Sequence, residues 1–384
     1  MKYLFTFLCG LFVFILSGQD LDDDGMNDTW EQANGLDPSD AKDAWLDPDN
    51  DQIINLFEYQ MNWNPDQAGD VATFDFTPES DSNAIRAAVL AADSIDVYIR
   101  LAQGRYLGNL VGFYTTSYRL FIQGGWNDDF SEFDPTQNKA IISYERDEAI
   151  SVNSVSEPGI THGVVICQGL QIDRSGHFVL AGGLHVGGNA EVGILSVIDC
   201  SFYQNNNYGI SFSNRGGITA DFFLVNSDVL NNYQGGIYTQ VTEKTNARFR
   251  IINSTIHNPF SSEGGIVGLT QFGDSSNLRI DCLNSIIRNN NDYDFSFSSA
   301  NKVSIFVENS NVGPPNPDIS DYSEVNSIDE NSLFENSAAN NVSLLAGSPC
   351  IDQGIDVGLP FMGMSPDMGA KEFGISAINS TAST

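Results

Sequence analysis

Two stretches near the start of the sequence carry carboxylates at the spacing of a calcium-binding loop. In residues 20–31, oxygen-bearing groups recur at loop positions 1, 3, 5, 7, 9 and 12, and Gly25 stands at position 6, where the chain must turn sharply. Because Ca2+ takes about six to eight oxygen ligands at short range, one turn of this kind can hold it. The ligands expected in this first loop are Asp20, Asp22, Asp24, the backbone carbonyl of Met26, Asp28 and Glu31.

The same pattern returns 27 residues later, in a second loop at residues 47–58. Gln52 occupies the position of the glycine, and a side chain there strains a backbone that must turn to positive φ. We therefore expect the second loop to bind calcium more weakly and to lose its ion first. The ligands expected in it are Asp47, Asp49, Asp51, the backbone carbonyl of Ile53, Asn55 and Glu58.

A short helix is expected at the end of each loop, over residues 28–34 and 55–61, with aromatic side chains inside it. A disordered acidic linker would carry the same charge, but two matches to the spacing, each closed by a glutamate, favour calcium sites. The segment resembles the thrombospondin type 3 and dockerin-like calcium repeats of bacterial surface proteins, and the resemblance implies bound Ca2+. It differs from an EF-hand pair, since no entering helix can precede Asp20.

The first 18 residues have the features of a secretory signal peptide: one positive charge, an apolar run and small residues at the end. An uncleaved membrane anchor is disfavoured because the apolar run is too short to span a bilayer. We therefore expect a secreted or cell-surface protein with no transmembrane span after cleavage.

Cleavage would move the net charge from −33 to −34, since Lys2 is the charged residue removed. Such a charge excludes nucleic acid as a partner and attracts divalent cations.

A short phrase recurs from residue 163 onward, and its period indicates the architecture. Two and four residues before its polar position, each copy has an apolar residue or a cysteine. Residues two apart share one face of a strand, so these columns are expected to point inward from one strand. The Asp and Asn residues at this position are expected to form a polar ladder at a bend: Asp199, Asn226, Asn253, Asn284 and Asn309, with Gly169 at the same position in the first copy.

A second phrase alternates with the first and begins at residues 183, 209, 236, 265 and 294. Two strands and several turns per repeat predict one coil of a parallel β-helix. An antiparallel sandwich is the alternative, but it would not hold the columns in register over six coils.

The chain also resembles the right-handed parallel β-helix (pectin-lyase-like) superfamily. The resemblance lies in the expected first rungs at residues 97–99, 104–106 and 120–126, and in a helix expected to cap the open end near residues 83–88. The phrases at residues 347–354 and 366–373 are similar to the closing phrase of the choice-of-anchor Q group of bacterial surface proteins.

The predicted fold class is therefore all-β: a right-handed parallel β-helix solenoid with an N-terminal capping helix and a small calcium-binding loop–helix segment. The expected parts are a signal peptide at 1–18, calcium-binding repeats at 19–66, the β-helix at 70–313, an irregular excursion at 314–346, a closing segment at 347–373 and a tail at 374–384.

Four cysteines remain after cleavage of the signal peptide. Cys167 and Cys282 occupy one inward column several coils apart, so they cannot bond to each other, and buried free thiols are favoured over disulfides. Cys200 sits in a different column, and no partner is assigned to Cys350.

For function, we expect a monomeric, exported, non-enzymatic protein that binds Ca2+ and a polysaccharide or another surface protein. The alternative is a polysaccharide lyase or glycoside hydrolase, because the superfamily includes both. Outward positions carry no evident pair of carboxylates on consecutive coils, which a hydrolase would need. A purely structural spacer is a third hypothesis. The outward residues considered for catalysis are Asp173, Arg174, His177, His185 and Arg288.

Overall fold

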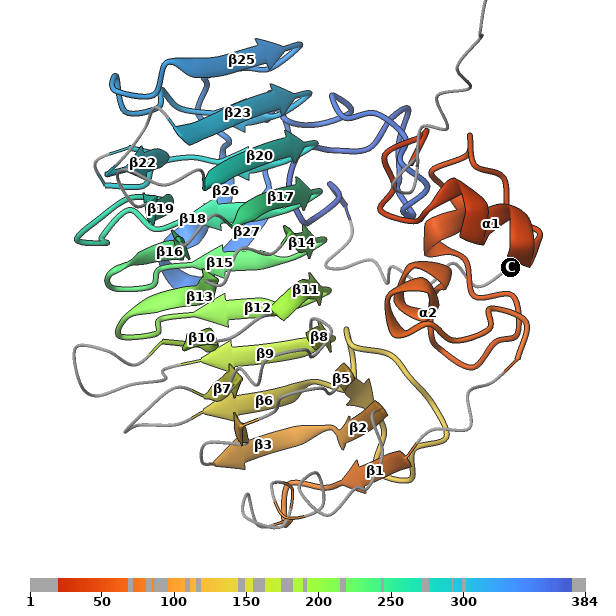
Figure 1. Ribbon diagram of the computed structural model, residues 1–384. Coiled ribbons are helices and arrows are strands. Elements are labelled where there is room, and N and C mark those ends of the chain that lie inside the picture. Colours follow the sequence, from red (N-terminus) through yellow and green to blue (C-terminus); the bar gives the residue numbers. More distant parts are fainter. Residues whose placement is uncertain are drawn as a thin grey trace, which may run out of the picture.

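The computed structural model is a right-handed parallel β-helix whose coils stack along one axis (Figure 1). In the part of the chain that the structure describes, its strands form parallel sheets of ten, eight and seven strands. The expected signal peptide, most of the expected capping helix and nearly all of the expected tail lie outside the described residues. The structure describes residues 20–67, 72–80, 85, 87, 96–107, 111–114, 119–143, 149–154, 163–173, 182–188, 192–214, 219–242, 245–270, 276–291, 293–298 and 302–374.

The strands of each sheet follow one another along the axis of the solenoid. The ten-stranded sheet comprises β1 (Ala72–Phe76), β2 (Asp96–Ala102), β5 (Arg119–Trp126), β8 (Gly163–Gln168), β11 (Val192–Ile198), β14 (Thr219–Val225), β17 (Asn246–Ile252), β20 (Asn277–Leu283), β23 (Val303–Glu308) and β25 (Asp321–Val325). The eight-stranded sheet comprises β24 (Asn311–Val312), β21 (Ile286–Ile287), β18 (Thr255–His257), β15 (Asp228–Leu230), β12 (Ser201–Tyr203), β9 (Leu170–Asp173), β6 (Ala140–Ser143) and β3 (Gly104–Leu107). The seven-stranded sheet comprises β22 (Phe295–Phe297), β19 (Ile266–Thr270), β16 (Gly235–Val241), β13 (Tyr208–Asn214), β10 (Leu184–Gly188), β7 (Ile150–Ser154) and β4 (Val111–Tyr114).

The number of strands per coil differs from the prediction. The sequence predicted two strands in each coil, and the structure has three, as in the run β8, β9 and β10. The additional strand lies in the eight-stranded sheet and is two to four residues long. A strand this short cannot display the alternation of apolar and polar residues by which strands are recognised.

The inward columns of the repeat are confirmed. Phe222 pairs in register with Leu195 on one side and Phe249 on the other, and all three side chains are fully buried. The rings of Phe222 and Phe249 meet edge to face, with centroids 4.7 Å apart. Each coil therefore covers the apolar side chains of the next, and the core runs the length of the solenoid.

The polar column stands at the bend between the ten-stranded and eight-stranded sheets, as predicted. Asn226 and Asn253 take left-handed backbone angles there, with φ of 47° and 44°. Asn and Asp enter this region at lower cost than other residues with side chains, which explains their recurrence at the bend. The side chains also bond along the stack, because Asn226 Nδ2 donates to Asp199 Oδ1 at 2.6 Å.

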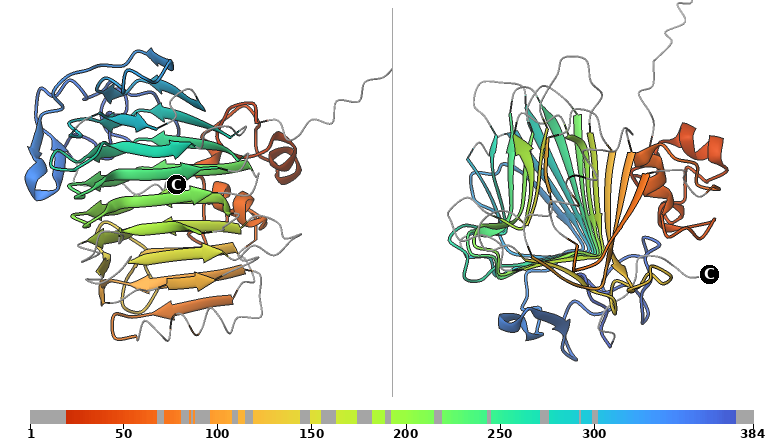
Figure 2. Two further views of the ribbon diagram at one scale, coloured as in Figure 1. Left: turned by 60° about the vertical axis from the view of Figure 1, so that its left-hand side comes forward. Right: turned by 90° about the horizontal axis from the view of Figure 1, so that it is seen from below.

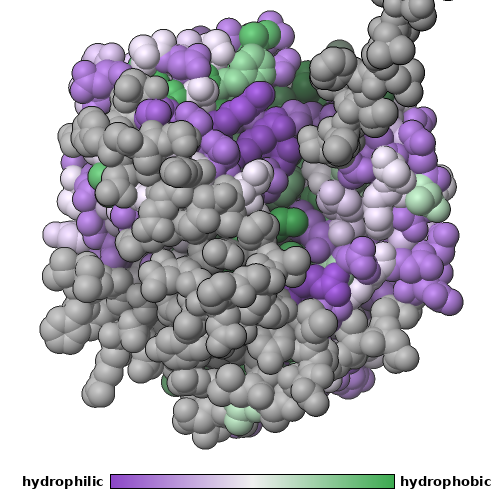
Figure 3. All heavy atoms as spheres, viewed as in Figure 1, coloured by the Kyte–Doolittle hydropathy of each residue, from purple (hydrophilic) through white to green (hydrophobic). Residues whose placement is uncertain are grey.

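The N-terminal segment, residues 20–67, lies outside the solenoid against the ten-stranded sheet (Figures 1 and 2). It contains the helices α1 (Asp28–Asn34) and α2 (Asn55–Met61), which match the predicted bounds, and the 3-10 helix η1 (Asp43–Trp45). The part of its surface visible in Figure 3 is mostly hydrophilic. Among the described residues, no helix is long and apolar enough to cross a bilayer.

The predicted irregular excursion at 314–346 is more ordered than expected. β25 adds a parallel strand to the ten-stranded sheet, next to β23. The strands β26 (Phe334–Asn336) and β27 (Asn341–Leu344) form an antiparallel pair joined by the 3-10 helix η3 (Ser337–Ala339). Tyr322 of β25 pairs in register with Ile305 and packs against the core, whereas the other side chains of this strand are exposed.

The closing segment, residues 347–373, runs back across the coils. Ile355 N donates to Asn284 Oδ1 at 2.9 Å, and Ala370 N donates to Thr255 Oγ1 at 3.1 Å, one coil earlier. An ion pair between Lys42 and Asp356 then joins this segment to the N-terminal segment.

Candidate metal centres

The two acidic loops have the same backbone course. Positions 4 and 6 are left-handed in both: Asp23 and Gly25 have φ of 64° and 103°, and Asn50 and Gln52 have φ of 59° and 75°. Gln52 therefore takes the positive φ that its position demands, and it bears the strain expected for a residue with a side chain.

The two loops also share one pattern of hydrogen bonds. The amides at positions 5, 6 and 7 donate to the carboxylates at positions 3, 1 and 5, respectively. In the first loop these bonds are Asp24 N to Asp22 Oδ1 (3.4 Å), Gly25 N to Asp20 Oδ2 (3.2 Å) and Met26 N to Asp24 Oδ1 (2.7 Å). In the second they are Asp51 N to Asp49 Oδ1 (3.2 Å), Gln52 N to Asp47 Oδ2 (3.0 Å) and Ile53 N to Asp51 Oδ1 (2.9 Å).

These bonds gather the carboxylates at positions 1, 3 and 5. Oxygens of Asp20, Asp22 and Asp24 lie within 4.8 Å of one another, and so do oxygens of the corresponding set in the second loop. In the first loop each backbone bond occupies one oxygen of a carboxylate, and no described residue donates a hydrogen bond to the other oxygen. Like charges held this close repel one another unless a cation lies between them.

A third group extends the first loop. Oxygens of Asp24, Glu31 and Asp43 also lie within 4.8 Å of one another, and all three residues are buried. Asp43 lies 12 residues beyond Glu31, so the loop spacing could not identify it. Its position depends on η1, and its Oδ2 accepts a hydrogen bond from Asp37 N at 2.8 Å.

Among the described residues, several buried side-chain oxygens in the loops and their helices have no hydrogen-bond donor. Leaving a buried charged oxygen without a partner costs several kcal/mol, so such atoms are candidate ligands for a cation. The carboxylate atoms are Asp20 Oδ1, Asp22 Oδ2, Asp24 Oδ2, both Glu31 oxygens, Asp43 Oδ1, Asp49 Oδ2 and Glu58 Oε2, and the amide oxygen Asn55 Oδ1 joins them.

The pKa values of these carboxyls reflect the same deficit of positive charge. Burial, together with the charge of neighbouring carboxylates, raises the pKa of Asp24 to about 8 and that of Glu31 to about 7. Burial likewise raises the pKa of Glu58 to about 9, with contributions from Asp51 and Asp49. A divalent cation at either group would reverse these shifts, because it favours the ionised form.

The remaining predicted ligands lie as follows. Asn55 is fully buried, and its Nδ2 donates to the carbonyl of Asp43 at 2.8 Å, which links the second loop to η1. The amides of Met26 and Ile53 donate to the carboxylates at position 5 of their own loops. Asp28 Oδ1 accepts a hydrogen bond from Leu21 N at 2.8 Å, and this carboxylate belongs to none of the groups of converging oxygens among the described residues.

Two arginines of β17 hold the first loop against the solenoid. Arg248 donates from two nitrogens to the two carboxylate oxygens of Asp23, and its Nε is 2.6 Å from Asp281. Arg250 lies 3.6 Å from Asp20 and is stacked over the ring of Phe223. Arg250 also donates to Asp221 of β14 at 3.0 Å and lies 3.7 Å from Asp23, so these arginines contact the loop at positions 1 and 4.

Apolar contacts complete the attachment. A Cβ on Gly25 would approach the Phe223 ring to 2.7 Å, so the first loop lies directly on β14. Phe57 of α2 meets Phe121 of β5 edge to face, with ring centroids 5.2 Å apart. In the second loop, the carbonyl of Gln52 accepts a hydrogen bond from Gln123 Nε2 at 2.9 Å. The loops are thus built into a packed interface.

The other candidate residues occupy structural contacts. All four described cysteines are buried and free, which confirms the prediction for Cys167, Cys200 and Cys282. Asp173 forms an ion pair with Arg105 at 2.9 Å. Arg288 pairs with Asp329, His185 faces outward on β10, and Arg174 and His177 lie outside the described residues.

Comparison with protein-family models gives no match for this chain. No curated protein matches it either. Among solved structures, the fold is similar to that of the crystal structure of pectate lyase Pel9A, with 14% sequence identity, a TM-score of 0.41, and coverage of 79% of this chain and 97% of that one. At this identity and score the similarity carries no argument about activity, substrate or site.

Proposed function

We propose that the N-terminal segment binds Ca2+ in both acidic loops, and that the bound ions fasten the segment to the ten-stranded sheet. The observation that carries this proposal is the convergence of three carboxylates in each loop. Within the described part of the chain, buried carboxylate oxygens without donors accompany it in the first loop and at Asp49 and Glu58 of the second. Hard oxygen ligands of this number and charge suit Ca2+. Residues Asp24, Glu31 and Asp43 would hold the first ion together with Asp20 and Asp22, and Asp47, Asp49, Asp51 and Glu58 would hold the second.

The role we propose for calcium is stabilisation. Both loops pack on the solenoid through Phe223, Phe121 and Gln123, so a bound ion has no free helix to move. Neutralising the buried carboxylates would remove the repulsion that opposes this packing. Calcium would therefore raise the stability of the segment and of the sheet that it covers.

The test is calorimetric titration of the calcium-free protein with CaCl2, together with thermal unfolding in calcium and in EGTA. We expect two binding events and a higher midpoint of unfolding in calcium, both abolished by Asp24→Ala combined with Asp51→Ala. A control pair, Asp128→Ala with Asp318→Ala, removes the same charge from exposed positions outside the loops and should change neither result. Unchanged calcium binding in the loop variant would refute the ligand assignment.

We further propose that the protein is exported and binds glycans or a surface partner without catalysis. The carboxylate of Asp173 pairs with Arg105 and accepts a hydrogen bond from Ser143, and Arg288 forms an ion pair with Asp329. These outward residues therefore make structural contacts. A polysaccharide lyase or hydrolase is the alternative. Incubation with a panel of acidic polysaccharides, followed by ultraviolet absorbance of unsaturated products and by reducing-end assay, decides between them, and product formation would favour the enzyme.

A further inference from the structure

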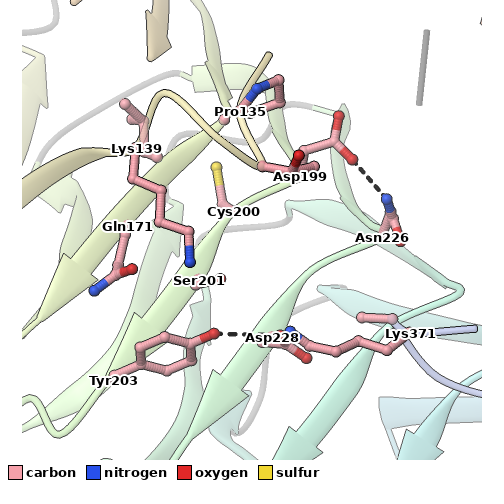
Figure 4. Close-up of a pocket in the computed structure, with 14 residues that line it drawn as sticks. Pro135, Lys139, Gln171, Asp199, Cys200, Ser201, Tyr203, Asn226, Asp228 and Lys371 are labelled. Carbon is pink, nitrogen blue, oxygen red and sulfur yellow. Dashed lines mark hydrogen bonds and ion pairs between the residues drawn. The ribbon is translucent and has the colours of Figure 1, made fainter. Parts of the chain in front are cut away.

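A polar pocket of about 150 Å3 opens on the outer face of the eight-stranded sheet, away from the calcium loops (Figure 4). Its floor is formed by Gln171, Ser201 and Asp228, which are paired in register on β9, β12 and β15. Neighbouring strands of a sheet lie about 4.8 Å apart, so the floor presents three hydrogen-bonding side chains in a row. The coil structure therefore builds this row without a specialised loop.

Two lysines form the walls of the pocket. Lys139 extends over it from the loop that precedes β6, and Lys371 enters from the closing segment (Figure 4). These are two of only six lysines in the chain. The next residue of the row, Thr255, bonds to Ala370 N, so the closing segment covers the row beyond Asp228 and ends the pocket there.

Asp228 is the most constrained polar group of the floor. Its residue is 3% exposed, and its Oδ2 is 2.9 Å from Lys371 Nζ and 3.3 Å from Tyr203 Oη. Its other oxygen, Oδ1, is buried and has no donor among the described residues. This fixed carboxylate therefore holds Lys371, whose side chain is still partly exposed, as a preorganised donor at this end of the pocket.

The charges that line the pocket balance. Lys139 and Lys371 are matched by Asp199 and Asp228, while the whole chain carries −33. An anionic ligand would meet no net positive charge here and would be repelled by the rest of the surface. A neutral ligand rich in hydroxyl groups fits, because each hydroxyl both donates and accepts, and the lining offers ammonium, phenol, amide and carboxylate groups.

We propose that this pocket binds one neutral pyranose residue of a glycan. A cavity of about 150 Å3 accommodates one six-membered ring, as a benzene-binding cavity of that size in another protein illustrates. Gln171, Ser201 and Lys139 bond to the ring hydroxyls, and Asp228 holds Lys371 beside them. This proposal rests on the glycan-binding part of the proposed function and gives it a site and a ligand class.

Saturation-transfer NMR on the full chain tests the proposal, with methyl glycosides of neutral hexoses as probes and a methyl glucuronide as the charged counterpart. We expect saturation transfer to at least one neutral glycoside and none to the glucuronide. Gln171→Ala combined with Ser201→Ala should weaken binding about tenfold or more, since two hydrogen bonds are lost. Both residues are only partly buried, so this variant should fold, as thermal unfolding will verify.

Lysine substitutions provide the matched comparison. Lys139→Met should weaken binding of the neutral glycoside, whereas Lys302→Met, which removes the same charge outside the pocket, should not. Absence of binding to every neutral glycoside, preference for the glucuronide, or insensitivity to the Gln171 and Ser201 changes would each overturn the proposal. Calcium titration of the same samples is independent of the pocket, so these outcomes leave the calcium proposal to be judged separately.

Discussion

The side-chain amide of Asn290 donates to Oδ1 of Asp294 at 2.8 Å, and this bond ends a buried column of asparagines. Asn205 donates to Asn232, Asn232 to Asn258 and Asn258 to Asn290, each from Nδ2 to Oδ1 at 2.9 to 3.3 Å. Every amide in the column thus donates along the stack in the same direction. A carboxylate, which accepts and does not donate when ionised, is the group that suits the end of such a column.

The first prediction concerns the pH dependence that Asp294 gives to the solenoid. Burial raises the pKa of this carboxyl to about 6, although Asn290, Gly313 and Arg288 favour its ionised form. The folded state therefore holds the proton more tightly than the unfolded chain, and the contribution of Asp294 to stability falls as the pH rises from about 4 to about 6. A shift of this size corresponds to about 3 kcal/mol at most.

Asp294→Asn should remove this contribution while keeping the acceptor for Asn290. The measurement is the free energy of unfolding in urea for both proteins at pH 4 and at pH 7. Between pH 4 and pH 7 the free energy of unfolding of the wild type should fall relative to that of the variant. The variant should therefore compare more favourably with the wild type at pH 7 than at pH 4. A constant difference at both pH values would contradict the assignment, because loss of the bond to Gly313 N has no pH dependence of its own.

The coils of the solenoid could be predicted because the same types of residue recur at the same place in each coil. The inward apolar columns and the Asn and Asp residues at the bend recur at nearly constant spacing, and each recurrence reinforces the last. The asparagine column that ends at Asp294 carries the same kind of signal, at spacings of 27, 26 and 32 residues, and could have been found from the sequence. The short strands of the eight-stranded sheet could not, because two to four residues show no period.

The packing of the N-terminal segment on the ten-stranded sheet was also not predicted, although the residues of β14 indicate that this sheet is covered on its outer face. Phe222, Phe223, Leu224 and Val225 are consecutive and all buried, which means that both faces of this strand are covered. A strand with one face in water alternates instead. The continuous apolar run therefore indicates an outer layer, but it does not identify which part of the chain supplies that layer.

The second prediction tests the ligand that the loop spacing missed. Asp43→Asn should weaken the first calcium site by about tenfold or more, because Asp43 is buried with Asp24 and Glu31 and an amide oxygen is a weaker ligand than a carboxylate. Calorimetric titration with CaCl2 measures the effect. Asp40→Asn is the matched control, since Asp40 is exposed three residues earlier and should leave both affinities unchanged. Equal affinities in wild type and Asp43→Asn would remove Asp43 from the site.

The third prediction concerns the strain in the second loop. Gln52→Gly should increase the free energy of unfolding by about 1 kcal/mol, because glycine takes a φ of 75° without the penalty that a side chain incurs. The bond from Gln123 is made to the backbone carbonyl of residue 52, so the substitution preserves it. Asn50→Gly, at φ 59° in the same loop, should give a smaller gain because asparagine tolerates this region. An equal increase in the free energy of unfolding for the two variants would show that Gln52 bears no more backbone strain than Asn50.

The fourth prediction separates two reasons for glycine at position 25. Its φ of 103° disfavours any side chain, and a Cβ there would also lie 2.7 Å from the Phe223 ring. Gly25→Ala should therefore destabilise the docked segment by about 3 kcal/mol, through backbone strain and overpacking together. Unfolding in urea and the rate of proteolysis within residues 20–67 report the change.

Gly35→Ala supplies the control, because Gly35 also has a positive φ of 79° but no atom lies within 4 Å of a Cβ placed on it. It should incur only the backbone cost of about 1 kcal/mol. The excess cost at Gly25 measures the contact with Phe223, and Phe223→Leu in the Gly25→Ala background should recover part of it. Equal losses in the two alanine variants would place the first loop farther from β14, and the calcium site would then be mechanically independent of the solenoid.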